Sequence, residues 1–327
     1  MRITVLTNVD REGSKAWDVV VDQVAAALKA NGHKVLVLPV HRDLKKLVTG
    51  LGRQQPDLVF NLLEEIDGVP DGNIGICGVL DLLRVPYTGC GPGELFLGQD
   101  KALAKKLLAY EGISYPKFAV FHRDHDFETG GNLRMPLFVK PVAMDASIGI
   151  GEKSLVHDAT ALMERVLAIH RECGDAALAE EYIEGRELYV GVLGNNSEAT
   201  ALPPIEVLFT GLPDGAPKVY SAKAKWDKGS EEYQGTHPVL AELPDELRAR
   251  VQKVSLDAYR ALRVRDYGRV DLRVADTGEI YVLEVNASCY LERHDEFTMA
   301  ANAAGLSHEQ LVQRIVEAAA ARRRTRR

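Results

Sequence analysis

The stretch YGRVDLRVADTGEIYVLEVNAS, residues 267–288, decides the interpretation of this chain. Two runs of alternating polar and apolar residues meet at DTGE, which predicts an antiparallel β-hairpin with Thr277-Gly278 at its turn. That turn places Asp271 opposite Glu284. Like charges that face each other across a ladder are destabilising, so the hairpin requires a compensating cation at this point.

The alternation also predicts which side chains of the hairpin share a face. The apolar face is expected to hold Val270, Leu272, Val274, Tyr281, Leu283 and Val285. The polar face is expected to hold Arg269, Asp271, Arg273, Glu284 and Asn286, with Arg269 opposite Asn286. Carboxylate and amide oxygens are ligands that Mg²⁺ prefers, together with phosphate oxygens, so the hairpin indicates a metal-nucleotide site. The structural alternative is a solvated face that the two arginines neutralise.

Length and composition set the broad class of the protein. The 327 residues suffice for two or three domains, and 46% hydrophobic with 27% charged residues is typical of a soluble globular protein. The net charge of -7 argues against nucleic-acid and anionic-membrane partners. The basic run at 321–327 is expected to be a solvated helix tail.

The cysteine pattern and the first residues point to the cytoplasm. The sequence MRITVLTNVD is expected to be a strand and not a signal peptide, and no run approaches the roughly 18 apolar residues that span a bilayer. No CxxC spacing is present, so reduced thiols are expected at Cys77, Cys90, Cys173 and Cys289.

Strand and helix patterns alternate over residues 1 to about 90. RITVLTN, KVLVLPV and DLVFNLL are strand-like, whereas residues 14–31 and NIGICGVLDLLRV have helical periodicity. This alternation predicts a parallel sheet with helices on both faces. The glycines and prolines of VPYTGCGPGELFLGQ then mark a boundary.

Two lysines and a glycine-rich loop are candidate phosphate ligands. Lys101 begins a predicted helix, whose N-terminus favours anions. Lys140 lies in the apolar strand FVKPV, where a lysine is costly unless an anion meets it, although it could instead extend to solvent. In DASIGIG, backbone N-H groups and the Ser147 hydroxyl could cover a triphosphate.

The segment AEEYIEGRELYV has the pattern of a nucleotide-binding linker. Glu180 and Glu181 come before a strand end, where backbone groups could bond an adenine edge, and Glu187 could reach ribose hydroxyls. A plain acidic hairpin rim is the alternative.

Taken in order, YTGCGPGELFLGQDKALAKKLLAYEGISYP, FVKPVAMDASIGIG, EEYIEGREL, AKW and the hairpin resemble the ATP-grasp superfamily, and D-alanine-D-alanine ligases most closely. The resemblance runs from about 57 to 312. It implies a three-domain α/β and α+β fold: an N-terminal parallel-sheet domain at 1–95, a central subdomain at 96–184 and a C-terminal subdomain at 185–327. It also implies an ADP-forming carboxylate-amine ligase that works through an acyl phosphate.

The resemblance implies a role for each matching residue. Lys101, Lys140 and Ser147 would bind nucleotide phosphates, and Lys225 in AKW would close over the γ-phosphate on a mobile loop. The adenine contacts would be Glu180, Glu181 and Ile183, and the ribose contact Glu187. The metal ligands would be Asp271, Glu284 and Asn286, and Arg269 would steady the acyl phosphate and the tetrahedral intermediate. ATP and two Mg²⁺ ions, with Mn²⁺ as a substitute, would be the cofactors, and a homodimer the assembly.

Two segments depart from the family pattern. LTNVDREGSKAW stands where these ligases have GGxSxE, and NASCYLERHDEF replaces NTxPGMT. The departures favour amino-acid-like substrates other than two D-alanines, with a D-alanine-D-alanine ligase proper and a non-catalytic ATP-binding regulatory protein as alternatives. His294, Asp295 and Glu296 lie close to where the acceptor amine should bind. An acidic pocket there could favour a substrate with an extra positive charge, or His294 could help to deprotonate the amine, although Asp295 is better explained as a helix N-cap.

Overall fold

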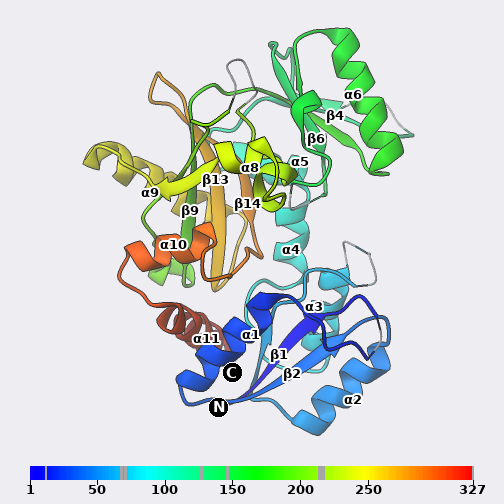
Figure 1. The fold of residues 1–327 in the computed structure, drawn as a ribbon, viewed down its shortest axis with the longest axis vertical. Coiled ribbons are helices and arrows are strands. Elements are labelled where there is room, and N and C mark those ends of the chain that lie inside the picture. The colour runs from blue at the N-terminus through cyan, green and yellow to red at the C-terminus, as the bar shows by residue number, and fades with distance from the viewer. Residues whose placement is uncertain are drawn as a thin grey trace.

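The computed structural model describes residues 1–11, 13–66, 69, 72–124, 128–144, 147–212 and 218–325. Within these residues the strands form three sheets, which follow one another along the long axis of the molecule (Figure 1). None of the helices in the described ranges is long and apolar enough to cross a membrane.

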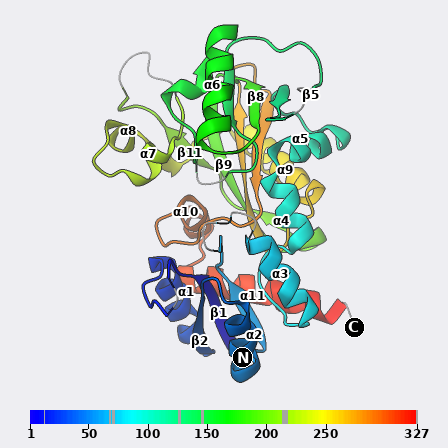
Figure 2. The same ribbon diagram turned by 90° about the vertical axis from the view of Figure 1, so that its right-hand side faces the viewer.

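The N-terminal sheet is parallel, with strand order β2-β1-β3, which confirms the prediction from the strand and helix alternation. Its strands are β1 (Arg2–Asn8), β2 (Lys34–Val40) and β3 (Leu58–Asn61). One face packs against α2 (Leu44–Gln54) and α3 (Gly72–Leu82). The other face packs against α1 (Val19–Ala30) and the C-terminal α11 (His308–Thr325), as Figure 2 shows.

The second sheet is antiparallel, with strand order β5-β4-β8-β6-β7. Its strands are β4 (Phe118–Phe121), β5 (Glu128–Thr129), β6 (Leu137–Pro141), β7 (Leu155–Val156) and β8 (Ala177–Glu181). α6 (Ala159–Glu172) covers the face that carries Val139 and Ala179. Because successive strand residues alternate in direction, Lys140 and Glu180 point to the opposite face.

The third sheet follows the order β12-β11-β9-β13-β14, and β10 pairs with β9. Its strands are β9 (Arg186–Leu193), β10 (Thr200–Ala201), β11 (Ile205–Leu208), β12 (His237–Leu240), β13 (Tyr267–Val274) and β14 (Ile280–Asn286). α9 (Asp245–Ala261) packs on its apolar face, and α10 (Glu296–Ala303) packs on part of the other. The remaining helices are α4 (Pro92–Gln99), α5 (Lys101–Tyr110), η1 (Glu152–Ser154), η2 (Asn196–Glu198), α7 (Ala222–Trp226) and α8 (Glu231–Gly235).

The β13-β14 hairpin has the predicted register at its functional end. Asp271 pairs with Glu284, and Arg269 pairs with Asn286. A β-bulge follows Asp271, so that Leu272 pairs with Val282. The pairing predicted beyond that point is therefore displaced by one residue.

The bulge changes the faces of β14, because one inserted residue reverses the side-chain alternation beyond it. Ile280 and Val282 are buried in the apolar core, whereas Tyr281 and Leu283, which were predicted there, are only partly buried. The predicted turn also shifts by one residue. Gly278, at φ +80, donates its N-H to the carbonyl of Ala275, so it follows the central turn residues.

Candidate active site

Buried lysines on α5 and β6 form one wall of the site. Lys101 and Lys140 are only 3% and 4% exposed, so neither extends to solvent. Lys140 Nζ lies 2.8 Å from Glu180 Oε1, and Lys105 Nζ lies 3.0 Å from Glu180 Oε2. Lys101 Nζ donates to the carbonyl of Met144 at 2.7 Å. These contacts place three positive charges on one side of the site.

Burial and charge pairing oppose each other in this lysine cluster. Burial lowers the pKa of Lys105. Burial would also lower the pKa of Lys140, but attraction to Glu180 and Glu284 raises it. Burial would raise the pKa of Glu180, but attraction to Lys105 and Lys140 lowers it. Both Glu180 and Lys140 are therefore held in their charged forms.

The polar face of the hairpin forms the opposite wall. Arg269 donates from Nε and Nη2 to the two oxygens of Asp271, at 2.7 Å and 3.0 Å. Asn286 Nδ2 donates to Asp271 Oδ2 at 3.0 Å, and the Arg269 guanidinium lies 4.6 Å from the ring centroid of Tyr189. Asp271 is therefore oriented by two neighbours on the same face.

Glu284 links the two walls, since its Oε2 lies 3.9 Å from Lys101 Nζ. Burial would raise the pKa of Glu284, but attraction to Lys101, Lys140 and Lys225 lowers it. Burial outweighs the attraction to Arg269 at Asp271, whose pKa is raised. The two acids that face each other across the hairpin thus have different electrostatic surroundings.

Asp271, Glu284 and Asn286 fit a Mg²⁺ site by their chemistry, because they bring carboxylate and amide oxygens to one face of the hairpin. In the described part of the chain no three His, Cys, Asp or Glu side chains converge on a point where they could bind a metal. The set is therefore limited to two carboxylates and one amide. Such a set suits an ion that takes its remaining ligands from phosphate and water.

The segment from Tyr220 to Trp226, here called the lid, contacts other residues of the site. Tyr220 precedes α7, and its carbonyl accepts a hydrogen bond from Ser147 Oγ at 3.0 Å. Lys225 Nζ lies 4.8 Å from the centroid of the Tyr220 ring. The Tyr220 hydroxyl donates to Glu296 Oε1 at 2.9 Å. Tyr220 therefore connects the predicted phosphate loop, the lid lysine and the start of α10.

The predicted nucleotide linker uses many of its polar groups within the protein. Glu181 accepts a hydrogen bond from the backbone N-H of Arg134 at 2.9 Å. The carbonyl of Ile183 accepts from Arg273 Nη1 at 2.8 Å, and Glu187 Oε2 accepts from Arg273 Nη2 at 2.7 Å. Arg273 thus holds the Ile183 and Glu187 positions together from β13.

Asp295 and Glu296 lie beside this site. Asp295 occupies the N-cap position of α10, as predicted, but its side chain makes no capping hydrogen bond. Burial and repulsion from Glu296 raise the pKa of Asp295. Glu296 Oε2 accepts from Arg269 Nη1 at 3.4 Å. The start of α10 therefore belongs to the surroundings of the predicted oxyanion arginine.

The comparisons with known proteins agree with this geometry. A family described as "D-ala D-ala ligase C-terminus" matches residues 107–317. The chain belongs to the D-alanine-D-alanine ligase family. It is 33% identical over 302 residues to D-alanine-D-alanine ligase from Desulforudis audaxviator, covering 90% of this chain and 91% of that one. It is 35% identical over 305 residues to the ligase from Methylobacterium radiotolerans, covering 91% and 92%.

Solved structures extend the match to the whole fold. The crystal structure of D-alanine-D-alanine ligase from Bacillus anthracis complexed with ATP has a TM-score of 0.78 and 26% identity, with full coverage of both chains. The protein is therefore an ATP-dependent ligase of the ATP-grasp fold that forms C-N bonds. An uncharacterised protein y4sG from Sinorhizobium fredii is also 33% identical over 314 residues, covering 92% of this chain and 87% of that one.

The structure brings the predicted residues of this ligase together in one region. Lys101, Lys140, Glu180, Asp271, Glu284, Asn286, Arg269, Ser147 and Lys225 all lie in the connected network described above. Lys105 was missed, although its place four residues after Lys101 puts both on one face of α5. Tyr220 and the contact between Glu296 and Arg269 were also missed, because sequence spacing says nothing about the lid.

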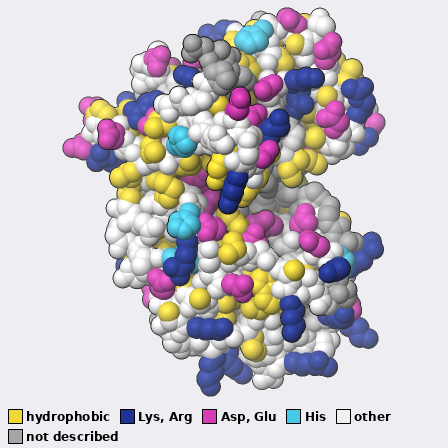
Figure 3. Space-filling model, viewed as in Figure 1, with side chains coloured by type: hydrophobic (Ala, Val, Ile, Leu, Met, Phe, Trp, Pro, Cys, Tyr) yellow, Lys and Arg dark blue, Asp and Glu magenta, His cyan; other side chains and the backbone are white. Residues whose placement is uncertain are grey.

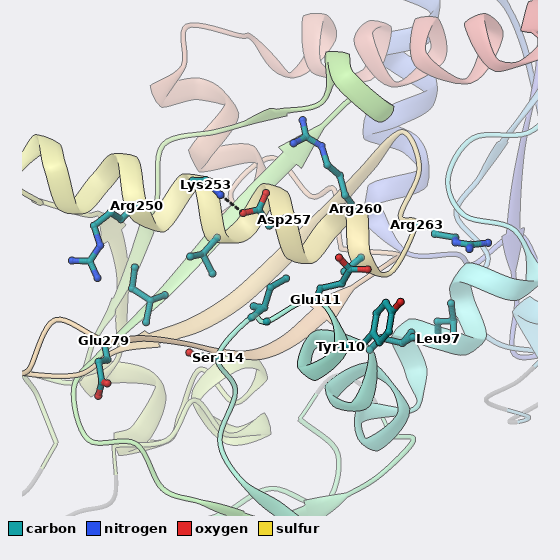
Figure 4. Close-up of a pocket in the computed structure, with 16 residues that line it drawn as sticks. Leu97, Tyr110, Glu111, Ser114, Arg250, Lys253, Asp257, Arg260, Arg263 and Glu279 are labelled. Atoms are coloured by element: carbon teal, nitrogen blue, oxygen red, sulfur yellow. Dashed lines mark hydrogen bonds and ion pairs between the residues drawn. The ribbon is translucent and has the colours of Figure 1, made fainter.

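A cavity lies elsewhere in this ligase. It has a volume of about 990 Å³ and lies between α5 and α9, with Tyr110, Arg250 and Lys253 in its lining (Figure 4). Lys253 pairs with Asp257 on the same helix. None of the predicted catalytic or nucleotide-binding residues lines it, so this cavity is not the candidate active site.

Proposed function

We propose that the protein joins an amino-acid-like carboxylate to an amine, with substrates other than two D-alanines, in a Mg²⁺-dependent reaction through an acyl phosphate. The observation that carries the proposal is the juxtaposition of Arg269 with Asp271, opposite Glu284 and the buried lysines. The replaced segments LTNVDREGSKAW and NASCYLERHDEF argue against D-alanine in both substrate sites.

In the first step, the lysines would bind and orient the phosphates for phosphoryl transfer. Lys101 and Lys140 would bind the nucleotide phosphates, and Lys225 would approach the γ-phosphate from the lid. Asp271, Glu284 and Asn286 would hold Mg²⁺, which neutralises phosphate charge in such sites. A carboxylate oxygen of the first substrate attacks the γ-phosphorus, the bond to the β-phosphate oxygen breaks, and ADP leaves.

Arg269 acts in the second step. The amine nitrogen attacks the acyl carbon, and the developing oxyanion accepts hydrogen bonds from the guanidinium, which stays charged at any working pH. Phosphate then leaves, and the nitrogen loses its proton to form a neutral amide. Tyr220 and Ser147 would keep the lid closed over the acyl phosphate and exclude water.

Adenine and ribose would bind at the linker. Glu180, Glu181 and Ile183 would flank the adenine, and Glu187 would reach the ribose. We also propose a homodimer, a cytoplasmic location consistent with four free cysteines, and the division into 1–95, 96–184 and 185–327. Analytical ultracentrifugation tests the dimer directly.

The experiment supplies ATP, Mg²⁺ and a panel of amino acids and small carboxylates, and measures ADP release and phosphate. Hydroxylamine in place of the amine traps an acyl phosphate as a hydroxamate. We expect one acid and amine pair to release ADP well above background. ATP binding without ADP release from any pair would contradict the proposal and favour a regulatory ATP-binding protein.

A further inference from the structure

Glu296 is a buried carboxylate that lies next to the proposed oxyanion arginine. The residue is 7% exposed, and its two oxygens have different partners. Oε2 accepts from Arg269 Nη1 at 3.4 Å, and Oε1 accepts from the Tyr220 hydroxyl at 2.9 Å. Its negative charge is therefore fixed between the arginine and the lid.

The position of Arg269 determines where the second substrate can bind. If its guanidinium bonds the oxyanion, the acyl carbon and the incoming nitrogen lie close to the same guanidinium. The guanidinium would then bond the oxyanion on one side and Glu296 on the other, each at about 3 Å. The substituents of the incoming amine would therefore lie within a few ångströms of Glu296. The acceptor must therefore tolerate a carboxylate as its neighbour.

Two of the donors around Glu296 are already engaged, and Lys225 is a further positive charge near its carboxylate. Arg269 is already shared by Asp271 and Glu296, and the Tyr220 hydroxyl donates to Glu296. Asp295 adds a second acid, whose Oδ2 is enclosed and meets no hydrogen-bond donor within the described residues. An enclosed polar atom without a partner is satisfied by a substrate group that hydrogen-bonds to it.

The electrostatic surroundings agree with the contacts. At the waist between the N-terminal sheet and the rest of the molecule, Figure 3 shows several Asp and Glu side chains together with Lys, Arg and His side chains. A substrate carboxylate at this place would be repelled by Glu296, and the repulsion is strong where water is excluded. A neutral or cationic substituent would meet no such repulsion.

We infer that Glu296 is a specificity-determining residue, which makes the acceptor site select amines without a carboxylate beside the amino group, such as diamines or amino acid amides. The inference rests on the proposed function, because it concerns the second substrate of that reaction.

The test compares matched acceptors with one donor acid, chosen from the hydroxamate screen. Glycine is compared with glycinamide and with 1,2-diaminoethane, and D-alanine with D-alaninamide. We expect kcat/KM to be at least tenfold higher for the amides or the diamine than for the free amino acids. Equal or higher kcat/KM for the free amino acids overturns the inference.

Variants then assign the preference to Glu296. Glu296→Gln removes the negative charge. It should reduce the ratio of kcat/KM for the amide to kcat/KM for the free amino acid at least fivefold. Glu292→Gln is the matched control, because Glu292 lies in the same segment but contacts Gln23 and not Arg269, so the wild-type ratio should persist. Tyr220→Phe keeps the Glu296 charge and should also keep the ratio. An unchanged ratio in Glu296→Gln, or an equal narrowing in Glu292→Gln, refutes the assignment.

The hydroxamate assay separates failure of this inference from failure of the proposed function. Hydroxylamine is a small uncharged amine, so hydroxamate formation shows acyl-phosphate chemistry whatever the acceptor preference. If hydroxamate forms and free amino acids are the preferred acceptors, the inference alone fails. If no acid gives hydroxamate or ADP, both fail together.

Discussion

At the scale of single residues, the site depends on charges that are buried because each has a partner. Arg269 and Asp271 are each 8% exposed, and Glu180 is 3% exposed. Burial of an unpaired charge is costly, so removing one member of such a pair changes the state of the other. Substitutions here should therefore separate chemical roles from structural ones.

Glu284→Gln should lower Mg²⁺-dependent ATP turnover while it leaves the fold nearly intact. Loss of a metal-binding carboxylate should lower the Mg²⁺ affinity or the activity by about 10-fold to 100-fold, as other substitutions around metal sites do. The fold should persist because relief of the repulsion between Asp271 and Glu284 offsets part of the lost attraction to Lys101. ADP release across a Mg²⁺ titration and the Tm measure the two effects.

Glu279→Gln is the matched control for this prediction, since Glu279 lies in the same hairpin and its carboxylate accepts hydrogen bonds from Thr277 and Tyr281. It should leave turnover unchanged. Normal turnover of Glu284→Gln at saturating Mg²⁺ would contradict the metal-ligand role.

Glu180→Gln should destabilise the protein and alter its response to acid. Loss of this carboxylate leaves Lys105 and Lys140 buried without their common partner, at a cost of about 3 kcal/mol. The pKa of Glu180 in the folded protein is below its ordinary value of 4.5. The stabilisation is therefore present above pH 4.5 and lost as the pH falls through the lower folded-state pKa.

Urea denaturation between about pH 3 and pH 7, a range that includes the ordinary pKa values of carboxyl groups, measures this effect. The decline in unfolding free energy below pH 4.5 should be smaller in Glu180→Gln than in the wild type. Identical pH profiles for the two proteins would show that Glu180 does not have a lowered pKa.

At the scale of elements, the two strands of the hairpin were predictable at one end and not at the other. Their alternation and turn residues correctly paired Asp271 with Glu284. The bulge after Asp271 was not visible, because Tyr281 and Val282 are both acceptable residues for a buried strand face. The contact from Val282 N to the carbonyl of Ser114, which lies outside the sheet, accompanies the shifted register.

Gly185→Ala should disturb the junction between the nucleotide linker and β9. Gly185 has φ +142, and an added Cβ would clash with the carbonyl of Val274. Relief of the clash requires backbone movement in β9 or β13, at a cost of roughly 1–3 kcal/mol. Urea denaturation measures the cost. The ATP concentration at half-maximal ADP release should rise, because Glu187, the proposed ribose contact, lies two residues after Gly185.

Gly278→Ala is the control for this prediction. Gly278 also has positive φ, but an added Cβ would meet only Arg250 Nη1, at 4.0 Å. It should therefore show a smaller loss of stability and an unchanged dependence on ATP. Equal changes in stability and in ATP dependence for the two substitutions would show that the clash with the Val274 carbonyl does not determine the effect of Gly185→Ala.

At the scale of the whole molecule, the C-terminal helix completes the N-terminal sheet. α11 packs with α1 on the face of that sheet opposite α2 and α3 (Figure 2). Arg322 on α11 donates to Asp266 at 2.6 Å and to the carbonyl of Tyr87 at 2.9 Å. Arg322 thus connects the residue before β13 to the end of the N-terminal unit.

Arg322→Ala should destabilise the protein as a whole. Asp266 has no exposed surface, and among the described residues it would keep the donors Gly89 N and Asn195 Nδ2. Breaking such a buried pair costs about 3 kcal/mol or more. Calorimetry should show a lower Tm for Arg322→Ala.

Lys253→Ala breaks the exposed pair with Asp257 and should change stability by less than about 0.5 kcal/mol. A loss of stability no greater in Arg322→Ala than in Lys253→Ala would show that the contact with Asp266 is not important for the assembly of the N-terminal sheet.

The sequence by itself determined the parallel N-terminal sheet, the paired acids of the hairpin and the ligase family, because these depend on local periodicity and on an ordered series of short motifs. Only the tertiary structure placed Lys105 against Glu180, Tyr220 over the site and Glu296 against Arg269. These contacts join segments far apart in the chain, and the burial that makes their charges interact strongly exists only once the sheets have packed together.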